Sequence, residues 1–86
     1  MATYRIELVR SAQKELDALD RTTRKRVLSS IAKLGTEPRP SGCKKLAGAD
    51  DRYRIRVGSY RVVYAVEDAR VLVLVLSIGH RREVYR

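Results

Sequence analysis

The chain has 86 residues, enough for one small domain and too few for two, so we expect a single domain over residues 1–86. A hydrophobic share of 44% is that of an ordinary globular protein and argues against disorder. The formal net charge of +9 indicates a polyanionic partner, whether nucleic acid, an anionic membrane or an acidic protein.

Cys43 is the only cysteine, which excludes an intrachain disulfide and a cysteine-based metal cluster. The N-terminal residues lack the apolar run of a signal peptide. The longest apolar run, residues 71–76, is too short to span a bilayer. We therefore expect a soluble, cytoplasmic protein in a reducing setting.

The first half of the chain predicts one strand and two helices. Residues 3–9 alternate, with Tyr4, Ile6 and Leu8 on one side, as in a strand. The period becomes helical from Ser11, a candidate N-cap, and Asp20 is a candidate N-cap of a second helix that Gly35 ends. The apolar positions of the second helix are Val27, Leu28, Ile31 and Leu34. These patterns predict a short helical hairpin.

The second half predicts three antiparallel strands. Residues 36–51 hold both prolines and predict a connecting loop. Strands over residues 52–57 and 60–66 are joined by Gly58-Ser59, which suits a type II′ turn. Residues 71–78 are apolar on both faces, which predicts a central strand. The order predicts an α+β fold: strand, helix, helix and three antiparallel strands, the helical hairpin packed on one face of a twisted, mainly antiparallel sheet.

The two-residue turn fixes the register of the predicted hairpin, so that Arg56 faces Arg61. One face then collects apolar side chains, and the other collects Arg52, Arg54, Arg56 and Arg61. Like charges opposite each other destabilise a sheet by about a few tenths of a kcal/mol. A solvated face is one interpretation. The absence of acidic residues among these arginines favours another, a bidentate site for phosphate.

The last strand and the C-terminus extend this face. Leu72, Leu74 and Leu76 would lie beside the arginines, either as core or as a docking surface for a partner helix. The ending "SIGHRREVYR" delivers polar side chains just beyond the sheet: His80, Arg81, Arg82, Tyr85 and Arg86.

Over nearly its full length the chain resembles the RelE side of the RelE/ParE toxin superfamily. The resemblance lies in the element order, the loop "PRPSGCKKLAG", the segment "YRIRVGSYRVVY" and the ending "SIGHRREVYR". It implies the toxin of a type II toxin–antitoxin pair that cleaves messenger RNA in the ribosomal A site. It also implies that no metal or other cofactor is used and that a RelB-like antitoxin silences the toxin.

By resemblance, the functional positions of that family fall on Arg54, Arg56, Arg61, Arg81 and Tyr85. RNA is cleaved when its 2′-hydroxyl attacks the adjacent phosphate, leaving a 2′,3′-cyclic phosphate and a 5′-hydroxyl. Arg61 and Arg81 suit stabilisation of the phosphorane charge. Tyr85 suits stacking on a base, or orienting or deprotonating the 2′-hydroxyl.

The chain departs from the best-known members, which carry lysines at the positions of Arg54 and Arg56. Arginine is a poor acid or base, so proton transfer is unassigned. His80 is a candidate general acid, because histidine ordinarily titrates near neutrality; the alternatives are an RNA contact or a surface residue. In a regular last strand His80 would share the side of Leu72 and Arg81 would point toward the core, unless Gly79 marks a bulge or strand end.

The expected partners are the ribosome, messenger RNA and the antitoxin. Basic residues outside the catalytic set are candidate contacts to RNA: Lys44, Lys45, Arg52, Arg82, Arg21, Arg24, Lys25 and Arg26. A solvated basic face explains the second helix equally well. Two other functions stay open: a ParE-like toxin that poisons DNA gyrase, which the joint presence of Arg61, Arg81 and Tyr85 disfavours, and an RNA-binding module without chemistry.

Overall fold

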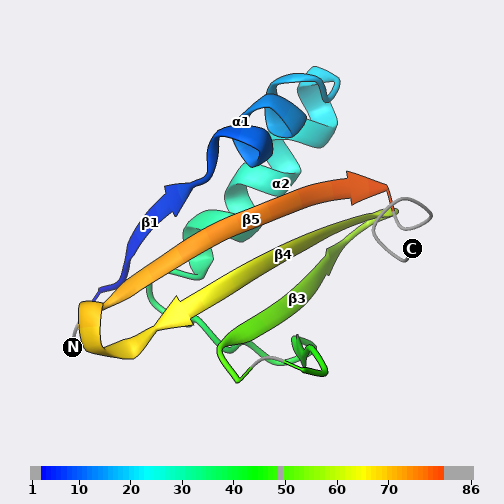
Figure 1. Ribbon diagram of the computed structural model, residues 1–86. Coiled ribbons are helices and arrows are strands. Elements are labelled where there is room, and N and C mark those ends of the chain that lie inside the picture. Colours follow the sequence, from blue (N-terminus) through cyan, green and yellow to red (C-terminus); the bar gives the residue numbers. More distant parts are fainter. Residues whose placement is uncertain (1–2, 49, 81–86) are drawn as a thin grey trace.

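The structure, a computed structural model, describes residues 3–48 and 50–80 (Figure 1). Its elements in chain order are β1 (Arg5–Leu8), α1 (Arg10–Asp17), α2 (Arg21–Lys33), β2 (Lys44–Lys45), β3 (Arg52–Val57), β4 (Tyr60–Glu67), the 3₁₀ helix η1 (Asp68–Arg70) and β5 (Leu72–His80). The five strands form one sheet in the order β1-β5-β4-β3-β2. Only β1, which runs parallel to β5, departs from antiparallel pairing. The predicted α+β fold is confirmed.

Strand β5 is central, as its two apolar faces predict, because it lies between β1 and β4. Val73 and Val75 point to the helices and are fully buried. Leu72, on the other face, is also buried. Burial on both faces is what selects an apolar residue at almost every position of such a strand.

The helices cover one face of the sheet (Figure 1). Asp20 caps α2 as predicted, since its carboxylate accepts a hydrogen bond from the Thr23 amide. Ser11 does not cap α1: that helix begins at Arg10, after Val9, which makes no side-chain cap bond. Of the four apolar positions of the second helix, Leu28 is 44% exposed. The inward face is formed by Val27, Ile31 and Leu34, which are buried.

The segment between α2 and β3 was predicted to be a connecting loop. It also contains the two-residue strand β2. Lys44 pairs with Arg54 and Lys45 with Tyr53, at the outer edge of β3. The hairpin between β3 and β4 turns through Gly58-Ser59 as predicted. Gly58 has φ 61° and Ser59 is not among the residues with positive φ, the combination that a type II′ turn requires.

A bulge interrupts the pairing of β4 with β5. Val63 pairs with Ser77 and Tyr64 with Val75, so Leu76 is the extra residue. An extra residue reverses which side chains after it face each side of the sheet. Ile78 therefore joins the core on the helix side, where it is buried. The bulge was expected, if anywhere, at Gly79; it occurs three residues earlier.

Among the residues that the structure describes, no helix is long and apolar enough to cross a membrane.

Candidate functional site

Four arginines form what we call the arginine face, on the side of the sheet away from the helices. They are Arg52, Arg54, Arg56 and Arg61. The predicted register is confirmed, because Arg56 is the direct partner of Arg61 across β3 and β4. Lys44 of β2 pairs with Arg54 and so extends this face toward the sheet edge. Lys45, one residue on, takes the opposite side.

Two members of the arginine face are buried. Arg54 and Arg61 are each only 5% exposed, whereas Arg52 and Arg56 are exposed. A solvated sheet face does not describe the buried pair, because removing a guanidinium from water is costly. A face kept only for solubility would leave all four in water. The burial shows that Arg54 and Arg61 are held within the fold, whereas Arg52 and Arg56 are the members of the arginine face that solvent reaches.

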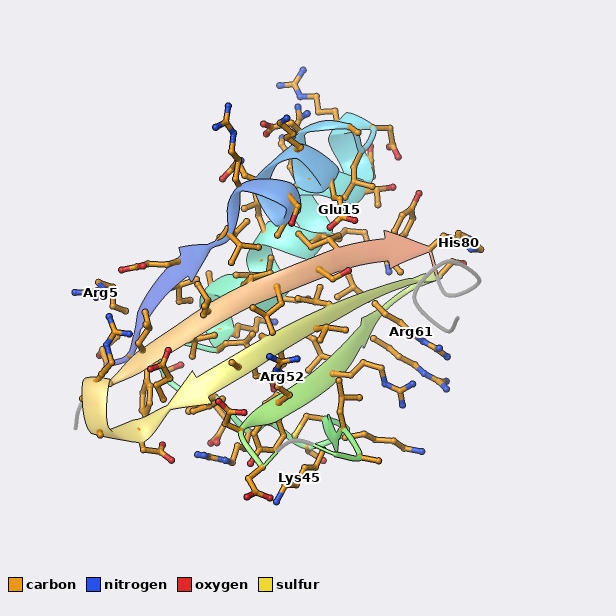
Figure 2. All side chains as sticks on the ribbon, in the orientation of Figure 1. Arg5, Glu15, Lys45, Arg52, Arg61 and His80 are labelled. Carbon is orange, nitrogen blue, oxygen red and sulfur yellow. The ribbon has the colours of Figure 1, made fainter. Side chains whose placement is uncertain are left out.

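Arg61 and His80 lie at the same end of the sheet, which we call the tip end: the β3–β4 turn, Arg56, Arg61, Gly79 and His80 (Figure 2). Gly79 pairs with Arg61, and His80 pairs with Tyr60. The His80 ring meets the Tyr60 ring edge-on, with centroids 5.6 Å apart. The last strand brings its end directly beside the hairpin, as the sequence predicted.

The bulge decides on which side of the sheet His80 lies. A regular strand would have placed it with Leu72, on the arginine face. After Leu76 the alternation is reversed, so His80 lies with Tyr60 on the helix side, in a cavity of about 220 Å³ that Glu15 and Leu19 also line. The structure thus brings His80 to the same end as Arg61, but on the opposite side of the sheet.

The basic helix α2 and strand β3 line the same groove. A cavity of about 460 Å³ between α2 and β3 is lined by Lys25, Arg26, Ser29, Ser30, Arg56, Val57 and Gly58. The guanidinium of Arg26 lies so close to Gly58 that an added Cβ there would stand 3.5 Å from Nη2. The basic residues of α2 and the arginines of β3, which are far apart in the sequence, are therefore neighbours in the fold.

The other basic residues of α2 differ from one another. Arg21 and Lys25 are exposed and face solvent. Arg24 is half-buried and donates hydrogen bonds to the carbonyl oxygens of Asp17 and Leu19, at 3.4 and 3.5 Å. Arg24 therefore holds the turn between α1 and α2. Its charge alone had suggested a contact to RNA.

A cluster that the sequence did not indicate lies at the opposite end of the sheet, where η1 turns the chain; we call this the turn end. Asp68 accepts hydrogen bonds from the Tyr4 hydroxyl at 2.6 Å and from Arg39 at 2.8 and 3.3 Å. Arg39 also donates to the Tyr53 hydroxyl at 2.9 Å. These bonds hold the pKa of the Asp68 carboxyl below its usual value and raise the pKa of Arg39.

The turn-end cluster fixes the loop after α2. Tyr64, whose pKa is raised chiefly by burial, donates from its hydroxyl to the carbonyl oxygen of Pro38 at 2.8 Å. Arg39 follows Pro38 directly, so both anchors act on one loop. No local pattern predicts the cluster, because its members come from four separate segments of the chain.

Three predicted site residues, Arg81, Arg82 and Tyr85, lie outside the described residues, as does Arg86. Within residues 3–48 and 50–80, no group of three or more His, Cys, Asp or Glu side chains is placed to hold a metal ion.

Comparison with known proteins identifies the class of this fold. The family described as ParE toxin of type II toxin-antitoxin system, parDE, matches residues 6–85. The mRNA interferase toxin RelE of Escherichia coli K12 is 36% identical over 86 residues, which cover 95% of this chain and 90% of the relative.

Two solved structures of RelE with RelB superpose closely on this chain. The archaeal RelE–RelB complex from Pyrococcus horikoshii OT3 matches with a TM-score of 0.82 and 32% identity, covering 92% of this chain and 96% of that one. The intact E. coli RelBE toxin–antitoxin complex matches with a TM-score of 0.80 and 34% identity, covering 90% and 95%. The chain belongs to the RelE/ParE family of type II toxin–antitoxin toxins, on its RelE side.

Proposed function

We propose that this toxin inhibits translation by cleaving messenger RNA on the ribosome, without a metal ion. The relative named mRNA interferase toxin RelE, at 36% identity, supports this activity. The observation that carries it is the arginine face, where Arg56 stands opposite Arg61 and two of the four guanidiniums are buried. Guanidiniums gathered on one face of a sheet suit bidentate contacts to the phosphates of an RNA backbone.

The proposed reaction is a transesterification within the RNA. The 2′-oxygen forms a bond to the adjacent phosphorus, and the bond from phosphorus to the 5′-oxygen breaks. The 2′-hydroxyl loses its proton and the leaving 5′-oxygen gains one, which gives a 2′,3′-cyclic phosphate and a 5′-hydroxyl. Water enters neither product.

Within this reaction, Arg54 and Arg56 bind the RNA backbone and Arg61 stabilises the charge that develops on the phosphorane. By resemblance, Arg81 shares the task of Arg61, and Tyr85 stacks on a base or acts on the 2′-hydroxyl. Arginine cannot exchange the protons, because its pKa stays above about 12. The proton donor is therefore His80, Tyr85, a ribosomal group or solvent, and a pH profile separates these.

The proposed partners are messenger RNA, the ribosome and a RelB-like antitoxin. The groove between α2 and β3, with Lys25, Arg26 and Arg56 along it, adds a basic surface for ribosomal RNA. Lys44 and Arg52 add two exposed cations on the arginine face itself. The antitoxin would bring acidic and apolar groups, which match the arginines and the half-buried Leu74 and Leu76 beside them.

A second candidate function is inhibition of DNA gyrase, because the matching family is described by its ParE member. One experiment separates the two. The purified chain is added to ribosomes translating a defined message, to the same message without ribosomes, and to a gyrase supercoiling reaction.

We expect cleavage only on the ribosome, loss of cleavage in Arg61→Ala, and full cleavage in Arg5→Ala. Arg5 is a suitable control because it is an exposed arginine at the opposite end of the sheet, paired with Glu7. Inhibition of gyrase with an intact message would instead establish the second function. Binding to RNA with neither effect would indicate an RNA-binding module.

A further inference from the structure

The last part of β5 has no strand partner on the β1 side among the described residues. β1 pairs with β5 only from Leu72 to Val75, and the last bond between them runs from the Val9 amide to the Val75 carbonyl. The chain then leaves the sheet as α1. Leu76 to His80 continue beyond this point, and among the described residues only β4 pairs with them.

The same segment is weakened by the bulge at Leu76. A bulge disrupts the ladder locally and increases the twist of the strand. The residues after it are held to β4 by the pairs of Ser77, Ile78, Gly79 and His80 alone. Without further support, the end of a strand in this situation frays.

Glu15 of α1 supplies the missing partner. Its carboxylate Oε1 accepts a hydrogen bond from the backbone amide of Ile78 at 2.9 Å, across 63 residues of sequence. Ile78 is 2% exposed, so its amide cannot turn to water and would be costly to leave unbonded. Figure 2 shows Glu15 between α1 and the later part of β5, and Glu15 and His80 line the same cavity.

The bond between Glu15 and the Ile78 amide holds the end of β5 in place at the tip end. Gly79, the next residue, is the partner of Arg61, and His80 is the partner of Tyr60. The chain then continues directly into the segment with Arg81 and Tyr85. A shift of the strand end by about 1 Å would change the spacing of Gly79 and His80 from Arg61, and displacements of this size can cost up to about 10²-fold in rate.

We propose that Glu15 is a positioning residue of the toxin: by bonding the Ile78 amide, it sets the end of β5 at the distance from Arg61 that catalysis needs. This inference rests on the proposed cleavage of messenger RNA. It assigns Glu15 no contact with RNA. A carboxylate near a binding site for a polyanion would otherwise be unfavourable, and its bond to a backbone amide gives a reason for its presence.

The test uses three variants of the full chain. Glu15→Ala removes the acceptor, and Glu15→Gln keeps a carbonyl oxygen at the same place. Asp17→Ala removes an exposed acidic residue of the same helix, whose side chain accepts a hydrogen bond from Gln13. Amide hydrogen exchange is measured at Ile78, with the Val9 amide as an internal reference, and ribosome-dependent cleavage gives kcat and KM.

In Glu15→Ala we expect exchange at Ile78 to accelerate about tenfold and kcat to fall about tenfold, with KM within about twofold of the parental value. Glu15→Gln should restore most of both, and Asp17→Ala should change neither. Faster exchange at Ile78 with unchanged kcat would overturn the proposal, as would unchanged exchange. If the parental chain does not cleave messenger RNA, the proposed function fails instead, while amide exchange still decides whether Glu15 holds the strand.

Discussion

The two ends of the sheet differ in how their charged side chains are paired. At the turn end, Asp68 accepts bonds from Tyr4 and Arg39, and Arg39 lies over the Tyr53 ring with 5.2 Å between its guanidinium carbon and the ring centroid. Opposite charges meet there. At the tip end, Arg56 faces Arg61 across the hairpin.

This difference separates a structural site from a candidate binding site. Arg39 at the turn end already has its carboxylate, so it adds nothing to the attraction of a polyanion. At the tip end two arginines stand opposite each other and Arg56 is exposed, so this end presents positive charge to a polyanion. We therefore expect substitutions of exposed tip-end residues to change activity with little effect on stability, and substitutions at the turn end to do the reverse.

The strongest expected effect is loss of cleavage when a phosphate-stabilising arginine is removed. Arg61→Ala and Arg81→Ala should each lower single-turnover cleavage about 10²- to 10³-fold and relieve toxicity. The melting temperature of Arg61→Ala is measured alongside, because this side chain is buried and only a folded variant assigns the loss of cleavage to phosphate stabilisation. Parental cleavage by either variant, expressed without antitoxin, would contradict the assigned role.

Antitoxin binding should affect the two ends unequally. We expect a RelB-like partner either to cover the basic sheet face, which slows hydrogen exchange in residues 52–64, or to displace the C-terminal segment, which changes exchange in residues 77–86. The loop around Arg39 should exchange at an unchanged rate. Unchanged protection in both segments would show that the antitoxin docks elsewhere.

A smaller effect is expected at His80, because this side chain lies on the helix side of the sheet rather than with Arg61. We expect His80→Gln to slow single-turnover cleavage less than about tenfold and to leave the shape of the pH profile intact. A general acid would behave differently. The protonated fraction of a general acid falls as pH rises, so the parental cleavage rate would fall at high pH. His80→Gln would then remove this pH dependence and lower the cleavage rate about 10²-fold.

The smallest expected effect belongs to the turn end. The Asp68 carboxyl has a lowered pKa in the folded protein, so its charge stabilises the fold above its unfolded pKa of about 3.9, and this contribution is lost as pH falls through the lower folded value. Asp68→Asn should therefore lower the melting temperature slightly at neutral pH, with cleavage unchanged.

That difference in melting temperature should disappear in acid, where the parental carboxyl is also protonated. Asp50→Asn is the matched control, since Asp50 is fully exposed and reaches Lys45 only at 4.0 Å. An equal drop in both variants, or a drop in Asp68→Asn that persists at low pH, would mean that the ion pair with Arg39 does not hold the loop.

Local patterns in the sequence determined much of this protein. The two-residue turn at Gly58-Ser59 fixed the register of the hairpin, and with it the pairing of Arg56 with Arg61. The apolar character of both faces of β5 identified the central strand, and Asp20 marked the start of α2. Each of these features depends on contacts within one turn, one strand or one helix end, which neighbouring residues set directly.

Other features were decided only by the tertiary structure. The burial of Arg54 and Arg61 depends on what lies over the sheet, which the alternation of a strand does not reveal. The bulge at Leu76 and the bond from Ile78 to Glu15 bring together strands and a helix that are far apart in the sequence. A single extra residue then reversed the side on which His80 lies, because the period of a strand is two and every side chain after the bulge changes face.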